Sequence, residues 1–250
     1  MGKINFREGV PQTGEGSPFR SRQFIWSSDE LLQGISAADL SRTPLDLNAF
    51  EPVLWNDLAS EYDARFMFEH IRFLLPDRTP QLSSILTLWY QDEANHFVGF
   101  RRLYSLFFNQ SAAEIDARLA RRRPDFSMFE PYFASECELC VLFAFDEIAT
   151  ARSYLADGPF YDQFGIPELG RWIRAVARDE AAHFRNFTTF VRGRFKDRSQ
   201  EFDAIVDGIL ELDLAKPTYE ATFVLDHTGP GFSRSFLLEC ARLLKDALTR

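Results

Sequence analysis

ARDEAAHF, residues 177–184, sets a glutamate three positions before a histidine, with an aspartate directly before that glutamate. YQDEANHF, residues 90–97, repeats the same order, Asp-Glu-Ala-x-His. On a helix, side chains three positions apart point the same way and lie about one turn apart. Each stretch can therefore present one carboxylate and one imidazole to the same point in space. The four residues are Glu93, His96, Glu180 and His183.

Apolar residues around both stretches recur three and four positions apart, which is typical of amphipathic helices. Four long helices and several shorter ones are predicted. The long helices are expected at 47–75, 80–108, about 127–155 and about 166–197. The shorter helices are expected at about 28–34, 111–123, 199–213 and 231–248. No alternating strand pattern bounded by hairpin turns is found, so the predicted fold class is all-α.

Local signals mark several helix boundaries. Thr79 and Pro80 have the residue types of an N-cap and of a first helical position. Ser111 and Glu114 form the pattern of a capping box. The stretch DGPFYDQFG, residues 157–165, predicts a break between the third and fourth long helices.

Four helices of this length predict an antiparallel bundle. The connection between the second and third long helices is the longest of the three, as a bundle with a crossover connection requires. We predict three parts: a partly ordered N-terminal arm over 1–45, a four-helix bundle over 46–197, and C-terminal helices over 198–250 that pack on the bundle.

Two further glutamates complete the pattern by their spacing. Glu147 lies 33 residues before Glu180, and Glu61 lies 32 residues before Glu93. Antiparallel helices of equal length would bring each such pair to one level, whereas Glu69 would lie about 12 Å away from Glu61 along the helix axis. One Glu from each of two helices and Glu-x-x-His from each of the other two is the ligand set of di-iron and di-manganese carboxylate bundles. The predicted metal ligands are Glu61, Glu93, His96, Glu147, Glu180 and His183.

The alternative interpretation is a pair of solvated charged turns. Both stretches stand among Trp, Phe, Val and Ala, which would be unusual on an exposed face, and four carboxylates buried together are costly without cations. Metal-bound histidines usually donate their outer N–H to a carboxylate. We expect Asp92 to lie beside His183 and Asp179 beside His96, the alternative being two ordinary surface aspartates.

With these residues, the sequence resembles the ferritin-like di-iron carboxylate superfamily over about residues 50–197, which implies a ferritin-like four-helix bundle. The run Glu147-Ile148-Ala149-Thr150 is most similar to the Glu-x-Ala-Thr run of soluble acyl-carrier-protein desaturases. The resemblance implies that Thr150 lies beside the oxygen-binding face, the alternative being a helical threonine that bonds back to a carbonyl. The chain is shorter than the plant-type desaturases, and Val176 stands where the N-oxygenase branch has an additional histidine.

The resemblance also implies two iron ions, and a manganese–iron pair is compatible with the same ligands. One ion would take Glu61 and His96, and the other would take His183 with Glu147 or its symmetry mate. The two Glu-x-x-His glutamates would bridge or chelate the ions. O2 would then oxidise a small-molecule or carrier-bound substrate. The expected pocket residues are Phe143, Ala144, Ala151 and Tyr154, with ordinary core packing as the alternative for each. No G-x-G-x-x-G fingerprint is found, so electrons are expected from an external donor such as a ferredoxin.

Composition and charge limit the classes of partner and the location that we expect for this protein. The formal net charge of −9 argues against nucleic acid, and no run of 18 apolar residues predicts a membrane span. Three cysteines, an odd and low number, fit a reducing cytoplasm. The 26 phenylalanines predict a thick aromatic core or an apolar pocket. Arginines at 101–102 and 121–123 could dock an acidic carrier protein or simply form solvated helix faces.

Three functions follow from these alternatives. The first is an oxygen-activating di-iron enzyme that hydroxylates, desaturates or otherwise oxidises an apolar or carrier-bound substrate, expected as a monomer or homodimer. The second is a ferroxidase or iron store of the bacterioferritin type, which needs a shell of many subunits. The third is a structural bundle without metal.

Overall fold

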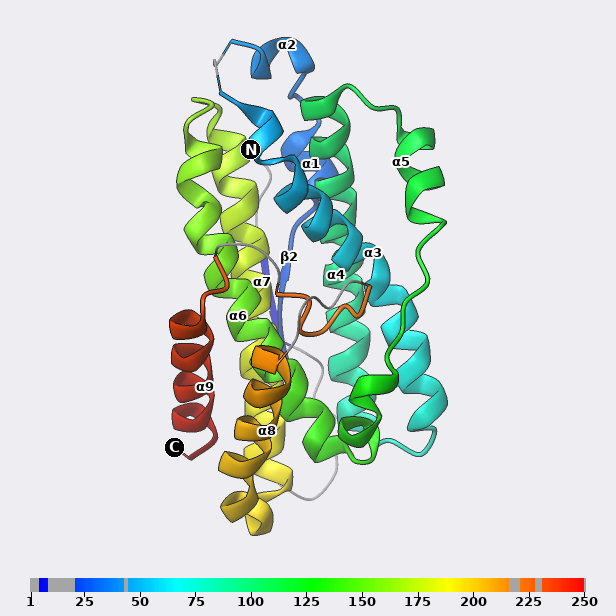
Figure 1. Cartoon of the computed structure of the whole chain (residues 1–250), viewed down its shortest axis with the longest axis vertical. Coiled ribbons are helices and arrows are strands. Elements are labelled where there is room, and N and C mark those ends of the chain that lie inside the picture. Colours follow the sequence, from blue (N-terminus) through cyan, green and yellow to red (C-terminus); the bar gives the residue numbers. More distant parts are fainter. Residues whose placement is uncertain (1–4, 9–20, 43–44, 216–220, 228–230, 250) are drawn as a thin grey trace.

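The structure, a computed structural model, describes residues 5–8, 21–42, 45–215, 221–227 and 231–249. Four long helices pack side by side along the length of the molecule (Figure 1). They are α3 (Glu51–Leu74), α4 (Pro80–Phe108), α6 (Glu136–Asp162) and α7 (Pro167–Arg194). The prediction of long helices that form a bundle is confirmed.

The helices form two antiparallel pairs, α3 with α4 and α6 with α7, and α4 also packs on α7. The connection from α4 to α6 contains helix α5 (Ala112–Leu119) and a 3-10 helix, η2 (Ser127–Phe133). In Figure 1 this connection runs from one end of the bundle to the other, so α4 and α6 run in the same direction. The longest of the three connections is therefore a crossover, as its length predicts.

The expected capping signals act as predicted. The side chain of Thr79 accepts a hydrogen bond from the backbone N–H of Leu82, and Pro80 opens α4. This helix ends at Phe108 and is followed by the C-cap residue Asn109, which has a left-handed φ of 49°. The capping box before α5 is complete, because Ser111 and Glu114 each accept the backbone N–H of the other.

The predicted break between the third and fourth long helices is present, but it begins later in the stretch 157–165 than expected. Helix α6 continues through Gly158 and Pro159 and ends at Asp162, and the turn falls at Gly165, which has a φ of 67°. A proline inside a helix removes one backbone hydrogen bond. Packing offsets that loss, because the ring of Phe160 stacks on Phe50 with centroids 3.8 Å apart. The start of this helix also differs from the prediction, since residues 127–133 form the 3-10 helix η2 and α6 begins at Glu136.

The N-terminal arm contains two short strands that the sequence did not predict. Strands β1 (Asn5–Glu8) and β2 (Arg22–Ile25) pair antiparallel, and helices α1 (Ser28–Leu32) and α2 (Ala37–Leu40) follow. The expected short helix near 28–34 is thus present. Strand β2 lies on α7, and α1 lies on both α4 and α7. The rest of the predicted arm, at 1–4, 9–20 and 43–44, falls outside the described residues.

A close approach of α4 and α7 supports this docking of the arm. Gly99 on α4 faces the ring of Trp172 on α7, and any Cβ at that position would overlap the indole. The indole Nε1 of Trp172 donates to Ser28 Oγ at 3.0 Å. The glycine therefore makes room for the tryptophan that holds the start of α1.

The C-terminal part adds a short 3-10 helix, η3 (Lys196–Glu201), and helices α8 (Phe202–Ala215) and α9 (Arg234–Thr249), which pack on each other and on α6. Between them, residues 221–227 cross the gap between α3 and α6 (Figure 1). The Ser60 hydroxyl of α3 donates to Phe223 O at 3.4 Å, and Asp146 of α6 accepts the N–H of Leu225 at 2.7 Å. No described helix is long and apolar enough to cross a membrane.

Two apolar clusters fill the bundle, one toward each end. One cluster contains Trp89, Phe143 and Phe187, and the other contains Phe100, Tyr154 and Trp172. On α3, α4 and α7, the predicted metal ligands lie between the stretches that supply these two clusters, whereas Glu147 on α6 lies at the end of the stretch that supplies the first cluster. The ligands thus form a polar level between the two apolar clusters.

Candidate metal centre

The six predicted ligands converge at the polar level of the bundle. Each of them is at most 5% exposed, although four are carboxylates. They form two groups in which one ligand atom from each residue lies within 4.8 Å of all the others. The first group is Glu61, Glu93, His96 and Glu180, and the second is Glu93, Glu147, Glu180 and His183. Glu93 and Glu180 belong to both groups, so the two groups are adjacent and joined.

In the first group, the Nδ1 atom of His96 faces three carboxylates. It lies 3.7 Å from Glu61 Oε2, 3.4 Å from Glu93 Oε2 and 3.2 Å from Glu180 Oε1. Because Glu93 and His96 are three apart on α4, both side chains leave the helix on one face. Glu61 arrives from α3 and Glu180 from α7, so three helices supply this group.

The second group repeats this arrangement around His183. Its Nδ1 atom lies 2.9 Å from Glu180 Oε2, 3.1 Å from Glu147 Oε2 and 3.3 Å from Glu93 Oε1. The lone glutamate here comes from α6, and the Glu-x-x-His pair comes from α7. The two oxygens of each shared glutamate face different histidines, which is the placement that a bridging carboxylate needs.

The outer nitrogen of each histidine faces an aspartate. His96 Nε2 lies 3.2 Å from Asp179 Oδ2, and His183 Nε2 lies 3.1 Å from Asp92 Oδ2. Both contacts join opposite helices, in the pairing that the sequence predicts. An aspartate in this place fixes the ring so that Nδ1 points toward the carboxylates.

Two arm residues hold these aspartates, and sequence reasoning missed both. The indole Nε1 of Trp26 donates to Asp179 Oδ2 at 2.6 Å, and Gln23 Nε2 donates to Asp92 Oδ1 at 3.0 Å. Helical spacing could not indicate them, because the arm has no helical period in this stretch. A tryptophan followed by two serines, as at Trp26, is too common in protein sequences to predict a functional site.

Burial and crowding shift the pKa values of the site. Burial first, and then the charges of Glu180 and Glu61, raise the pKa of Glu93 well above its ordinary range. Burial also raises the pKa of Glu147 well above its ordinary range. Although burial alone would lower the pKa of His96 and His183, the surrounding carboxylates raise both well above the ordinary value. The surrounding carboxylates therefore favour the protonated form of both imidazoles when no cation is present.

The residues fit a pair of divalent cations by three observations. Within the described residues, Glu61 Oε2, Glu93 Oε1, His96 Nδ1 and Glu180 Oε1 are buried without a hydrogen bond of good geometry. Buried polar atoms are otherwise almost always paired. Four carboxylates carry four negative charges, which two divalent cations would neutralise. Carboxylate and imidazole ligands suit iron, manganese and zinc. These buried groups could therefore hold metal ions.

The other predicted functional residues all lie on α6. Tyr154 is 4% exposed, and its hydroxyl donates to Glu61 Oε1 at 2.9 Å, so it contacts a candidate ligand directly. Thr150 lies one turn after Glu147 and is half-buried. Phe143 packs in the apolar core against Trp89 and Phe187, with ring centroids 5.2 and 5.3 Å away. The two alanines, Ala144 and Ala151, are buried.

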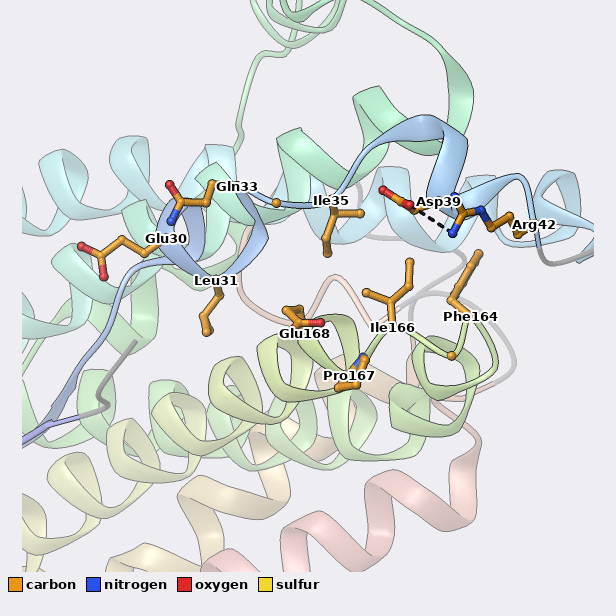
Figure 2. Close-up of a pocket in the computed structure, with 12 residues that line it drawn as sticks. Glu30, Leu31, Gln33, Ile35, Asp39, Arg42, Phe164, Ile166, Pro167 and Glu168 are labelled. Carbon is orange, nitrogen blue, oxygen red and sulfur yellow. Dashed lines mark ion pairs between the residues drawn. The ribbon is translucent and has the colours of Figure 1, made fainter. Parts of the chain in front are cut away.

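A pocket of about 700 Å³ lies between the arm and the turn that joins α6 to α7 (Figure 2). Its apolar lining includes Leu31, Ile35 and Ile166, and the ion pair of Asp39 and Arg42 lies at its edge. None of the predicted ligands or pocket residues lines it. This surface pocket is therefore distinct from the metal centre.

The arginine clusters are largely engaged within the chain. Arg101 pairs with Asp116, and Arg102 donates to the carbonyls of Leu32 and Gln33. Further along, Arg122 donates to the fully buried Asp63, with Nε 2.9 Å from Oδ2. These contacts favour structural roles over a basic docking patch. The three cysteines are buried and free.

No family model matches the chain, and no curated protein matches it. What the site can do must therefore follow from the geometry of its own residues, two adjoining groups of buried carboxylates and imidazoles.

Proposed function

We propose that this protein is a non-haem di-iron oxidoreductase with a ferritin-like bundle, which uses O2 to hydroxylate, desaturate or otherwise oxidise an apolar or carrier-bound small molecule. One observation carries the proposal: two ligand groups share Glu93 and Glu180, and each adds its own histidine and its own glutamate. Two metal ions held side by side are the simplest occupants of such an arrangement.

Each residue has a defined role in this proposal. Glu61 and His96 would hold one ion, Glu147 and His183 the other, and the two shared glutamates would bridge them. Two iron ions so ligated supply dioxygen activation. The aspartates behind the histidines orient the imidazoles and keep Nδ1 free of a proton when the metal is bound. Thr150, one turn beyond Glu147, is the candidate for contact with oxygen or substrate.

The surroundings of the site suit oxidative chemistry. Apolar clusters lie on both sides of the polar level, so bulk water is excluded from the reacting groups. The Tyr154 hydroxyl holds Glu61 by a hydrogen bond at 2.9 Å, which limits the orientations of that carboxylate. Electrons would come from a separate donor such as a ferredoxin. The same ligands could serve a ferroxidase, which differs in assembly and in lacking an organic substrate.

The first test is iron stoichiometry. Apo-protein is loaded with Fe(II) without oxygen, and O2 is then admitted while the near-ultraviolet and visible spectrum is followed. We expect close to two irons per chain and a transient oxygen adduct. Glu180→Ala should lose both, whereas Glu168→Gln, an exposed carboxylate on the same helix, should keep both. Iron retained unchanged in Glu180→Ala would exclude the proposed ligands.

The oligomeric state distinguishes the proposed oxygenase from an iron-storage protein. A monomer or dimer on a sizing column, together with substrate-dependent O2 consumption, supports the oxygenase. A large closed shell that takes up many irons per chain would instead establish the iron store.

A further inference from the structure

The gap between α3 and α6 holds a row of carboxylates that begins next to the metal centre. Tyr154 of α6 donates to Glu61 of α3 at 2.9 Å, so these two residues lie at one level. Asp57 lies one turn before Glu61 on α3, and Asp157 lies about one turn after Tyr154 on α6. Because α3 and α6 run antiparallel (Figure 1), both aspartates lie on the same side of that level, roughly 5–6 Å along the axis.

A third aspartate joins them from the segment 221–227. Asp226 is 8% exposed, and its backbone carbonyl accepts a hydrogen bond from Asn56 Nδ2 at 3.4 Å. Burial first, and then the charges of Asp157, Glu61 and Asp226, raise the pKa of Asp57 well above its ordinary range. Asp57 therefore lies within the electrostatic field of all three of these carboxylates.

Asp57 and Asp157 differ from Glu61, which faces His96, and from Asp226, whose pKa the charge of His227 lowers. Among the described residues, no lysine, arginine or histidine forms an ion pair with Asp57 or Asp157. Other acidic residues on the same helices are paired, as Asp63 is with Arg122 and Asp162 is with Arg174. Uncompensated negative charge next to a buried site is unfavourable. It attracts cations strongly, because a cleft with one sign of charge focuses the field.

A second observation points to a ligand in this gap. The hydroxyl of Tyr161 is buried without a hydrogen-bond partner in the described residues, and the side chain is 1% exposed. Tyr161 lies one turn after Asp157 on α6, and burial and the charges of Asp57 and Asp157 raise its pKa. At the inner end, Glu61 Oε2 is also unpartnered. Oxygen atoms without a hydrogen-bond partner, which could bind a hydrated cation, therefore lie at both ends of the row.

We propose that Asp57, Asp157 and Asp226, with Tyr161, form an entry passage through which a hydrated divalent cation reaches Glu61. Asp57 and Asp157 are partly buried, whereas Glu61 is only 5% exposed, so the row leads from the surface inward. Hard divalent cations prefer oxygen ligands and tolerate water in their shell. The three aspartates do not belong to the tight ligand groups found among the described residues. The row therefore binds cations only weakly and releases them toward Glu61. This inference rests on the proposed metal centre.

The test measures how fast the metal enters. Apo-protein is mixed with Co(II) in a stopped-flow instrument, and the growth of the cobalt absorption is followed; bound cobalt is counted after dialysis. The variants are Asp57→Asn, Asp157→Asn and the double variant, each of which keeps the shape of the side chain. Glu69→Gln is the matched control, because it removes one charge from an exposed position of α3.

We expect each single variant to load several-fold more slowly and the double variant about tenfold more slowly, the low end of electrostatic steering. The final stoichiometry should remain two per chain, and added salt should slow the wild type toward the variants. Loading at the rate of Glu69→Gln would overturn the passage. Loss of bound cobalt in the aspartate variants would also overturn it, because these residues would then be ligands. If the wild type binds no cobalt, the proposed metal centre is wrong, and the proposed passage is then wrong as well. Thermal melting of each apo-variant confirms that it is folded.

Discussion

His96 presents Nδ1 to three carboxylates while its Nε2 lies 3.2 Å from Asp179 Oδ2. His183 repeats the relationship with Asp92 at 3.1 Å. Each imidazole is thus fixed by an aspartate from the opposite helix, and the two halves of the centre hold each other. The orientation of one half therefore depends on residues of the other.

Asp179→Asn should weaken the half of the centre that contains His96. An amide cannot accept the imidazole N–H as strongly as a carboxylate, and loss of such a partner typically lowers metal affinity about 10–100-fold. Chelator competition with Co(II) measures the two affinities separately. We expect one weakened and one nearly unchanged.

Asp92→Asn is the matched control, because it should weaken the half that contains His183 by a similar factor. Equal weakening of both ions in either variant would contradict the assignment of one aspartate to each half.

Trp26→Phe should loosen the arm from the bundle. The variant keeps an aromatic ring but removes the N–H that donates to Asp179 Oδ2 at 2.6 Å. A hydrogen bond to a charged partner contributes about 1.5–3 kcal/mol, and Trp26 is only half-buried, so we expect a loss of about 1–2 kcal/mol in unfolding free energy. Urea unfolding gives this number.

Gln23→Met removes the corresponding donor to Asp92 with little change in shape. A similar, smaller loss is expected there. If neither variant changes stability or metal affinity, the arm only covers the site and does not position it.

Phe143→Ala distinguishes a core residue from a pocket residue. The ring is fully buried against Trp89 and Phe187, and removal of a buried phenylalanine typically costs about 3–5 kcal/mol. We expect a loss in this range by urea unfolding, with no change in metal stoichiometry. A loss below about 1 kcal/mol would mean that the ring borders open space, as a substrate pocket requires.

Stability should fall as the pH rises above neutrality, because of His227. Although burial alone would lower its pKa, Asp213 and Asp146 raise it to about 9. A folded-state pKa above the ordinary value of about 6.5 gives stability that is complete below that value and is lost as pH rises toward 9. Asp226 acts in the same direction at lower pH, since burial and Asp146 raise its pKa to about 7.

The measurement is urea unfolding of the metal-free protein at pH 6, 7.5 and 9. The wild type should lose stability across the series, and His227→Gln should show a flatter dependence above pH 6.5. An identical slope in both proteins would assign the effect to other groups.

The parts of the structure that follow regular helical geometry could be predicted from the sequence. α4 begins and ends where the prediction puts it, because Thr79, Pro80 and a 29-residue helical pattern all agree. The six candidate ligands converge for the same reason, since spacing on equal helices fixes their level. The end of α6 was mispredicted, because stacking of Phe160 on Phe50 is a tertiary contact that local residues do not reveal. The contacts of Trp26 and of residues 221–227 are equally non-local.

Metal binding should release protons, and this prediction ties the charge of the centre to its occupancy. The carboxylates raise the pKa of His96 and His183 well above the ordinary value. We therefore expect both imidazoles to be protonated at pH 7 in the metal-free protein, although only a deprotonated Nδ1 can bind a metal. Each bound ion displaces at least one proton, so the apparent affinity must increase with pH. Mixing metal-free protein with Co(II) in weakly buffered indicator dye at pH 7 should acidify the solution by at least about two protons per chain. Glu168→Gln should behave as the wild type. Binding of two ions without acidification, and with an affinity independent of pH, would show that the imidazoles are neutral before the metal arrives.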